Sequence, residues 1–201
     1  MKLSELCTIQ MGFTARARLD PAEDGGRLAI QLRDIAPDGE IGLATLARVD
    51  LPDVSDRYGV TKGDVVFRSR GERTIAIALD DSLREAAIAI LPLIVLRPDP
   101  SRITPEFLAW SINLPTSQRH LDQASQGGSL RMVPKSALED LRLDVPDLAT
   151  QRQITAAAQL AKREAALAAT LVEKNLSLTT LALADIAKRA SDIRPSERSK
   201  S

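Results

Sequence analysis

Cysteine, histidine and aromatic side chains are scarce in this sequence of 201 residues. The single cysteine, Cys7, excludes an internal disulfide and a metal site built from several cysteines. The single histidine, His120, has no cysteine near it in the sequence, so we expect no transition-metal site. Aromatic residues make up 2% of the chain, which argues against a surface that stacks single-stranded bases.

Long apolar stretches are also missing. No uninterrupted apolar run reaches the roughly 18 residues of a membrane-spanning helix, and the first residues lack the apolar segment of a signal peptide. We therefore expect a cytoplasmic protein. The hydrophobic fraction of 44% is still large enough for a packed core. With so few aromatic rings, that core must consist mainly of Leu, Ile, Val and Ala.

Charges balance over the whole chain but are unevenly distributed. Residues 1–150 contain 18 Lys and Arg against 22 Asp and Glu, whereas residues 151–201 contain 9 against 5. Of the 18 basic residues in the first part, 15 are arginines. A guanidinium group can bond the O6 and N7 atoms of guanine, or a phosphate, through two hydrogen bonds. The composition therefore allows a locally basic face on an acidic domain.

The order of periodic segments predicts an α+β fold in three parts. These are a compact domain with a mixed β-sheet at residues 1–146, a long helix at 147–190 and a disordered tail at 191–201. Within the compact domain, Phe107 and Trp110 lie at helical spacing and are expected to pack in the core. The predicted strands are 28–35, 63–68, 74–79, 88–96 and 141–145, and the predicted helices are 104–114 and 116–124.

The long helix is predicted to begin at Pro146-Asp147, and Thr150 with Gln153 matches a capping box in its first turns. Residues 154–190 contain no Gly and no Pro. Apolar residues at three- and four-residue steps indicate a stripe that packs against a partner helix. An alternative is a hairpin that folds back near residues 175–177. The stripe comprises Ile154, Ala161, Ala168, Leu171, Leu178 and Leu181.

The best candidate for a DNA contact surrounds Gly71, directly after a strand-like apolar run. Loops at strand ends often carry function, and arginines there can hold a phosphate or a base. The alternative is a solvated turn whose arginines pair with Glu72 or Asp64. The candidate residues are Arg68, Ser69, Arg70 and Arg73.

Three further groups of polar residues are candidates for DNA contact. One group follows Gly12, a second lies on the expected outer face of the strand at 28–35, and a third surrounds a pair of glycines. Glycine lets a backbone approach a phosphate closely, and glutamine can bond adenine through two groups. The alternative for the first and third groups is a plain polar loop or turn. The groups are Arg16 and Arg18; Gln31 and Arg33; and Gln126, Ser129 and Arg131.

Several short motifs occur in an order that resembles one family. They include Leu3-Ser4-Glu5-Leu6 leading to Gly12, Ile30-Gln31-Leu32-Arg33-Asp34-Ile35, Lys62-Gly63-Asp64-Val65-Val66-Phe67, Leu96-Arg97-Pro98, Gly127-Gly128-Ser129, and Val145-Pro146 followed by Gln151. Over about residues 1–190 the chain resembles one target-recognition domain and spacer helix of the specificity subunits of type I restriction-modification systems. It departs from that pattern by having one domain and one helix instead of two of each, and by lacking a proline after Gly12.

This resemblance implies a function without catalysis and without a cofactor. The domain would recognise duplex DNA, and the helix would dock an adenine-N6 DNA methyltransferase subunit. A restriction subunit, a nuclease and translocase, is a further partner that the resemblance allows. A chain with one domain and one helix would act as a half-subunit that forms a homodimer, its long helix pairing with that of a second copy as an antiparallel coiled coil. A two-fold dimer would read a gapped inverted repeat.

Two other classes of function remain open at this stage. The chain could be a coiled-coil assembly protein whose globular domain binds protein rather than DNA, which the acidic balance of residues 1–150 favours. It could also be an enzyme, although the sequence contains no recognisable catalytic constellation.

Overall fold

The computed structural model describes residues 1–15, 19–22, 25–36, 39–51, 54–71, 73–125 and 131–192. The chain divides into two units, Met1–Thr155 and Ala156–Ser201. The elements, in chain order, are η1 (Leu3–Glu5), β1 (Cys7–Met11), β2 (Arg27–Ile30), η2 (Leu32–Asp34), η3 (Leu43–Thr45), β3 (Arg48–Val49), η4 (Asp56–Tyr58), β4 (Gly59–Val60), β5 (Val65–Arg68), β6 (Ile75–Ala78), β7 (Ala87–Ala89), β8 (Leu93–Pro98), α1 (Pro105–Ile112), α2 (Pro115–Ala124), α3 (Lys135–Asp140) and α4 (Leu148–Asp192).

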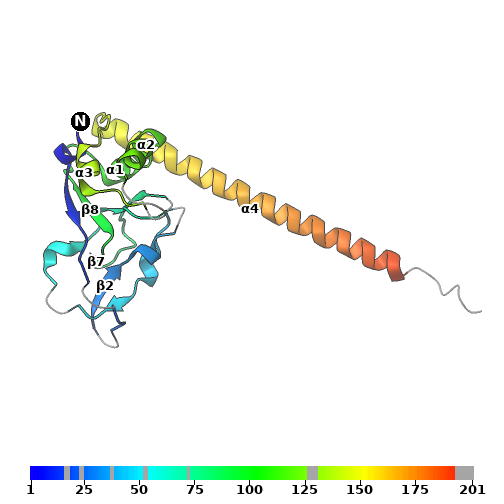
Figure 1. Cartoon of the computed structure of the whole chain (residues 1–201). Helices are drawn as coiled ribbons and strands as arrows, with labels where there is room; N and C mark the ends of the chain where they lie inside the picture. Colours follow the sequence, from blue (N-terminus) through cyan, green and yellow to red (C-terminus); the bar gives the residue numbers. More distant parts are fainter. Residues whose placement is uncertain are drawn as a thin grey trace, which may run out of the picture. The chain divides into compact units, whose positions relative to one another are not determined.

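Strands of the first unit form two four-stranded sheets within the described residues. The first has the order β1-β8-β5-β6 and is antiparallel throughout. The second has the order β3-β2-β7-β4 and is mixed, because β2 and β7 run parallel while the other pairs are antiparallel. Helices α1, α2 and α3 lie together at the end of the unit that contains β8, and β2 and β7 lie at the other end (Figure 1). The predicted α+β class is confirmed.

Alternation along the central strands explains this layering. In β5, Val65 and Phe67 point into the core shared with α1, while Val66 points into a second core shared with the other sheet. β8 alternates in the same way, with Ile94 on the helix side and Val95 on the other. Successive strand residues point to opposite faces, so a strand buried on both faces must be apolar throughout. The first sheet is therefore the middle layer of the unit.

The two sheets meet where the chain leaves β1. The backbone N–H of Gly12 donates to Leu93 O (2.8 Å), and that of Phe13 donates to Ala89 O (2.7 Å). A Cβ atom at Gly12 would lie 2.8 Å from both Ala89 O and Leu93 O, so only glycine fits this crossing. The close approach of three backbone segments at this point fixes one sheet against the other.

Three of the predicted strands are wrong in part. The strand predicted at 28–35 ends at Ile30, and the one predicted at 88–96 is two strands, β7 and β8, because the chain changes sheets between them. Residues 141–145 join no sheet: α3 precedes them, and Arg142 forms one isolated bridge with Lys2. The predicted alternation there is nevertheless present, because Leu141 and Leu143 are buried while Arg142 is exposed.

Helix α4 begins one residue after Asp147, which caps it. One carboxylate oxygen of Asp147 accepts from the backbone N–H groups of Ala149 (2.9 Å) and Thr150 (3.0 Å). The bond from the Thr150 N–H is the main reason that the pKa of Asp147 lies below its usual value. The capping box predicted for Thr150 and Gln153 is wrong, because Thr150 already lies inside the helix.

Gln151 fastens the first turns of α4 to the first unit. Its side chain is fully buried. The amide oxygen accepts from the Thr104 N–H (2.9 Å), and the amide nitrogen donates to Arg102 O (2.9 Å) and Pro146 O (2.8 Å). These three bonds join the loop before α1 to the entry of α4. A buried amide with three backbone partners positions the helix start more strictly than apolar contacts alone, since each bond has a preferred direction.

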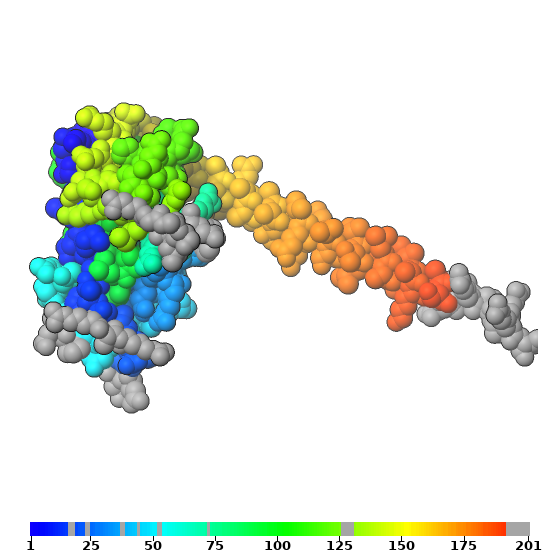
Figure 2. Space-filling view, in the orientation of Figure 1, coloured from blue at the N-terminus to red at the C-terminus, as the bar shows by residue number. Residues whose placement is uncertain are grey.

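The rest of α4 is a single uninterrupted helix, so the alternative hairpin near residues 175–177 is not formed. At about 1.5 Å per residue, its 45 residues extend about 67 Å. Its large apolar side chains from Leu160 to Ile186 are 61–69% exposed. Figure 2 shows this part as a rod of side chains, coloured orange to red. Among the described residues, no helix combines the length and apolar character needed to cross a bilayer.

We predict that Gln151→Glu lowers the free energy of unfolding of the first unit by about 3 kcal/mol at pH 7. The carboxylate would face the carbonyl oxygens of Arg102 and Pro146 and could donate to neither. Burial beside two carbonyls raises the folded-state pKa of the new glutamate, so the loss is complete above that pKa. The loss of stability shrinks as the pH falls below this folded-state pKa, because a protonated carboxyl can donate one hydrogen bond.

Urea unfolding at pH 7 and pH 5 measures both effects. Gln153→Glu is the matched control, because residue 153 is exposed two positions along the same helix. Equal stability of the two variants at pH 7 would show that the buried amide does not fasten the helix.

Candidate nucleic-acid interface

A short two-stranded ribbon emerges where β5 ends. The chain continues from Arg68 into residues 69–71, which run antiparallel to residues 131–133. The Val133 N–H donates to Ser69 O (2.8 Å), and the Gly71 N–H donates to Arg131 O (3.5 Å). Arg70 and Met132 lie opposite each other between these two bonds. The ribbon therefore brings together residues that are about 60 positions apart in the sequence, from two of the predicted candidate groups.

Ser69 and Val133 form the inner side of the ribbon. Both are buried, and the Ser69 hydroxyl donates to the carbonyl oxygen of Pro92. The expectation that Ser69 contacts DNA does not agree with this geometry, because its hydroxyl is covered and already bonded. Its role is to attach the ribbon to the turn between β7 and β8.

Arg68 also has a structural role. Its guanidinium donates to Ile35 O (3.1 Å) and to Arg70 O (3.2 Å), and its side chain is half-buried. Gly71 has a φ of +127°, and a Cβ atom there would lie 2.9 Å from the Arg68 guanidinium. Glycine is thus required for the turn and for this contact. Arg68 supports the ribbon from behind rather than extending from it.

Arg70, Arg73 and Arg131 are exposed. Within the described part of the chain, their guanidinium groups form no ion pair and no hydrogen bond. In particular, Asp64, one of the suggested ion-pair partners, pairs with Arg97 instead. The other suggested partner, Glu72, lies outside the described residues. As far as the described residues go, Arg70, Arg73 and Arg131 are three cations without a partner, the arrangement that suits a phosphate or a base edge.

The predicted positions of Gln31 and Arg33 on the face of a strand are wrong. Residues 32–34 form η2, because the Asp34 carboxylate accepts from the Gln31 N–H (2.7 Å) and closes a turn. Arg33 is exposed, whereas Gln31 is half-buried and its amide nitrogen has no partner among the described atoms. This segment still adjoins the ribbon, because Ile35 O accepts from Arg68.

The remaining candidates for DNA contact, Arg16, Arg18, Gln126 and Ser129, lie outside the described residues.

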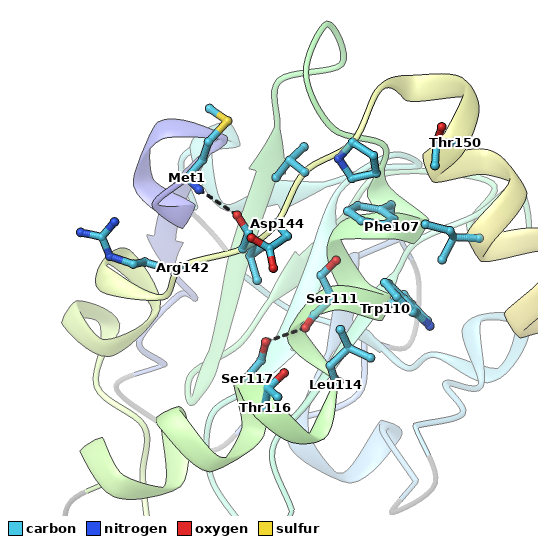
Figure 3. A pocket seen from close by; sticks show the side chains of 14 residues that line it. Met1, Phe107, Trp110, Ser111, Leu114, Thr116, Ser117, Arg142, Asp144 and Thr150 are labelled. Atoms are coloured by element: carbon cyan, nitrogen blue, oxygen red, sulfur yellow. Dashed lines mark hydrogen bonds between the residues drawn. The ribbon is translucent and has the colours of Figure 1, made fainter.

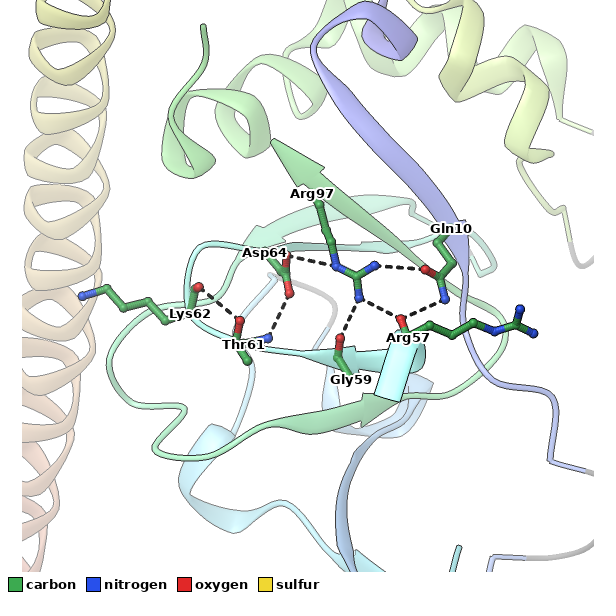
Figure 4. Close-up of polar contacts among 7 residues, drawn as sticks. All are labelled: Gln10, Arg57, Gly59, Thr61, Lys62, Asp64 and Arg97. Carbon is green, nitrogen blue, oxygen red and sulfur yellow. Dashed lines mark hydrogen bonds and ion pairs between the residues drawn. The ribbon is translucent and has the colours of Figure 1, made fainter. Parts of the chain in front are cut away.

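A second polar cluster, which the sequence did not indicate, joins the two sheets around Arg97 (Figure 4). The guanidinium donates to Gln10 Oε1 (3.0 Å), Arg57 O (2.9 Å) and Gly59 O (2.7 Å), and lies 3.6 Å from the Asp64 carboxylate. Burial raises the pKa of Asp64, and the Thr61 N–H and Arg97 act in the opposite direction. Because each of the three guanidinium nitrogens faces an acceptor of the protein, we interpret this cluster as a structural link between the sheets.

A pocket of about 610 Å³ opens beside α1 and the first turns of α4 (Figure 3). Phe107 and Trp110 form part of its wall, with the ring of Phe107 buried in the core as predicted and Trp110 half-buried. The hydroxyls of Ser117 and Thr150 on its lining already donate to Ser111 O (2.7 Å) and to the Asp147 carboxylate (2.7 Å). Arg142 and Asp144 add charged groups to the lining, and the buried Ser111 hydroxyl has no partner among the described atoms, so the pocket offers both apolar and polar surface.

Cys7 behaves as a small core residue. It is buried, and burial raises the pKa of its thiol to about 12. A thiol with this pKa is protonated at neutral pH and is a poor nucleophile.

Comparison with known proteins gives the fold. No family model matches the chain, and no curated protein matches it. Among solved structures, the S subunit of the type I restriction-modification system from M. genitalium matches with a TM-score of 0.56 and 14% identity, over 89% of this chain and 42% of that one. The HsdS subunit from Thermoanaerobacter tengcongensis matches with a TM-score of 0.57 and 20% identity, over 83% and 37%. This chain has the fold of type I specificity subunits.

A third match comes from a structure that addresses complex assembly and conformational transition of the type I restriction-modification system. Its TM-score is 0.61 at 21% identity, over 90% of this chain and 42% of the matched one. The chain thus spans about two fifths of the length of the specificity-subunit structures that it matches. The fold that the sequence motifs suggested is confirmed.

Proposed function

We propose that this chain is a non-catalytic DNA-recognition subunit that reads a sequence in duplex DNA for a partner methyltransferase. The observation that carries the proposal is the ribbon, which gathers the unengaged guanidinium groups of Arg70 and Arg131 on a fold shared with type I specificity subunits. Arginine forks aimed outward from a rigid sheet can bond guanine edges and phosphates. The one buried hydroxyl described on the ribbon, that of Ser69, already donates to Pro92 O and therefore does not point to catalysis.

The acidic balance of residues 1–150 does not oppose this proposal. DNA at the ribbon interacts mainly with the charges close to the ribbon, because exposed charges more than about 8–10 Å apart are screened at physiological salt. Arg70 and Arg73 lie three positions apart, and the pairing of the ribbon brings Arg131 next to the residue opposite Arg70. The anionic remainder of the surface would lower binding to DNA in general, so the contact is restricted to one place.

We further propose that α4 pairs with a second copy in an antiparallel arrangement. Of the predicted stripe, Ile154 packs against the first core and is not free for a partner, while Ala161, Ala168, Leu171, Leu178 and Leu181 are exposed. The sequence analysis missed Leu160 and Leu167, which are next to Ala161 and Ala168 in the chain and about 100° from them around the helix. A seam that includes these leucines leaves Ala161 and Ala168 at its edge. Leu160, Leu167, Leu171, Leu178 and Leu181 recur at steps of seven, four, seven and three residues, the spacing of a coiled-coil seam.

Helix α4 also has a second apolar stripe. Val172, Leu176, Leu183 and Ile186 recur at helical spacing, and at 3.6 residues per turn this stripe lies about a third of a turn from the first. One partner helix cannot cover both stripes. The proposed role of the second stripe is to dock the adenine-N6 methyltransferase subunit, which leaves the first for the second copy.

We predict that Arg70→Ala, Arg73→Ala and Arg131→Ala together weaken binding to the target duplex at least tenfold near physiological salt. Loss of three phosphate or base contacts also lowers the slope of log K against log salt by up to about 2.7, since each phosphate contact contributes about 0.9. Fluorescence anisotropy across a salt series measures both quantities.

The control for this variant removes the same charge elsewhere, through Arg84→Ala, Arg119→Ala and Arg142→Ala, all exposed in the first unit. If both triple variants lose binding equally, only the total charge matters. If neither loses binding, the alternative of a protein-binding assembly factor is supported instead.

We predict that Leu167→Lys, Leu171→Lys and Leu178→Lys convert the dimer into a monomer, because three charges would face the partner helix across the seam. Sedimentation equilibrium of the whole chain over a range of concentrations gives the oligomeric state. The matched control places the same three lysines away from the seam on the same helix, through Gln159→Lys, Ala166→Lys and Thr180→Lys, all exposed. A wild-type chain that is monomeric at high concentration, or a dimer that survives the leucine changes, would contradict the pairing.

We predict that deleting the heptad 167–173 shortens the gap of the DNA target by about three base pairs. Seven residues of helix correspond to about 10.5 Å, and successive base pairs are 3.4 Å apart. A heptad keeps the remaining stripe in phase, so the helices can still pair. Mapping of N6-methyladenine in cells that express the chain with its methyltransferase gives the motif. An asymmetric motif, or a gap unchanged by the deletion, would rule out the two-fold arrangement.

A further inference from the structure

Met132 stands out on the surface of the first unit. Apart from Met1, it is the only large hydrophobic residue described there as exposed, with 43% of its surface accessible. All the other large apolar residues described in that unit are buried or half-buried. A thioether in water beside the arginine ribbon is therefore an exception that a bound ligand would explain.

The pairing of the ribbon places Met132 beside Arg70. The two hydrogen bonds of the ribbon, at Ser69 and Val133 and at Gly71 and Arg131, flank this pair. Arg70 and Met132 thus form a non-hydrogen-bonded pair, in which opposing Cβ atoms are about 4.5–5.5 Å apart. The neighbouring pair, Ser69 and Val133, is buried, so alternation directs Arg70 and Met132 to the outer face together.

An arginine and an apolar side chain held side by side match the edges of two neighbouring base pairs. Arginine bonds the O6 and N7 atoms of guanine in the major groove, and apolar side chains contact the methyl group of thymine there. Base pairs are 3.4 Å apart, close to the separation of the two side chains at their base. A two-stranded ribbon also fits the width of the major groove. Arg131 directly precedes Met132, so alternation directs its side chain to the other face of the ribbon, and Arg73 lies three residues after Arg70. Both are exposed cations that can hold phosphates beside the groove and fix the register.

Resting on the proposed function, we propose that Arg70 and Met132 are specificity-determining residues that read a guanine and an adjacent thymine methyl group from the major groove. Met132 then becomes buried only when the correct base pair is present. A docking protein is a weaker explanation for the exposed thioether, because the Arg70 guanidinium paired with it would have to be matched by a carboxylate of the partner.

Selection from a library of random duplexes by the full wild-type chain first identifies the bound motif. Each thymine of that motif is then replaced by deoxyuridine, which lacks the methyl group, and each guanine by 7-deazaguanine, which lacks the N7 acceptor. Dissociation constants are measured for the wild type, Met132→Ala, Met132→Leu and Arg70→Ala. Both positions are exposed, so the fold tolerates these changes, and thermal unfolding verifies this.

The expected result is that deoxyuridine at one thymine weakens wild-type binding about fourfold, the effect of one buried methyl group. Met132→Ala binds the two duplexes equally, and Met132→Leu restores the preference. At the neighbouring guanine, 7-deazaguanine weakens the wild type but not Arg70→Ala. The inference is overturned if no thymine methyl matters, if the motif has no thymine beside a guanine, or if the preference persists in Met132→Ala. A wild-type chain that enriches no motif at all instead overturns the proposed function.

Discussion

Burial of the first sheet on both faces is the constraint on which the rest of this structure depends. β5 and β8 occupy its centre, with helices on one side and the second sheet on the other. A strand in this position cannot move without opening two cores. At Arg68 the strand leaves the core, and the next three residues form the ribbon. The candidate interface is thus a direct extension of the most rigid part of the unit, which limits the entropy lost when it orders on a ligand.

Five of the fourteen arginines described in the first unit tie other segments of the chain together. Their guanidinium groups donate to backbone carbonyls of those segments, at Arg27, Arg48, Arg68, Arg97 and Arg102. An arginine used in this way holds irregular chain in place, since one fork can satisfy two acceptors. This explains why an arginine-rich composition does not by itself make a DNA-binding surface. The informative arginines are the ones that the fold leaves unengaged.

The sequence was sufficient to predict the elements that have a regular hydrophobic period or an end marked by a residue such as proline. The start of α4 after Pro146 and its uninterrupted length followed from helix propensity and the absence of Gly and Pro. It was not sufficient where a single hydrogen bond decides the local conformation. Asp34 turns a strand-like run into η2, and the crossing at Gly12 depends on backbone atoms from β7 and β8. Both local conformations depend on contacts that cannot be inferred from the periodicity of the sequence.

The candidate site was likewise predictable from the sequence only in part. The grouping of arginines around Gly71 was visible in the sequence, because Gly and Arg directly after an apolar run indicate a functional strand end. The pairing of residues 131–133 with this strand end could not be foreseen, since cross-strand pairing is long-range. The inward position of Ser69 depends on that pairing. The outward position of Met132 was also unexpected, since Met is usually a core residue. The same pairing explains how an acidic domain could bind DNA selectively. If general affinity for phosphate is low, the few contacts made by one short ribbon account for a larger share of the binding energy, and discrimination between sequences increases.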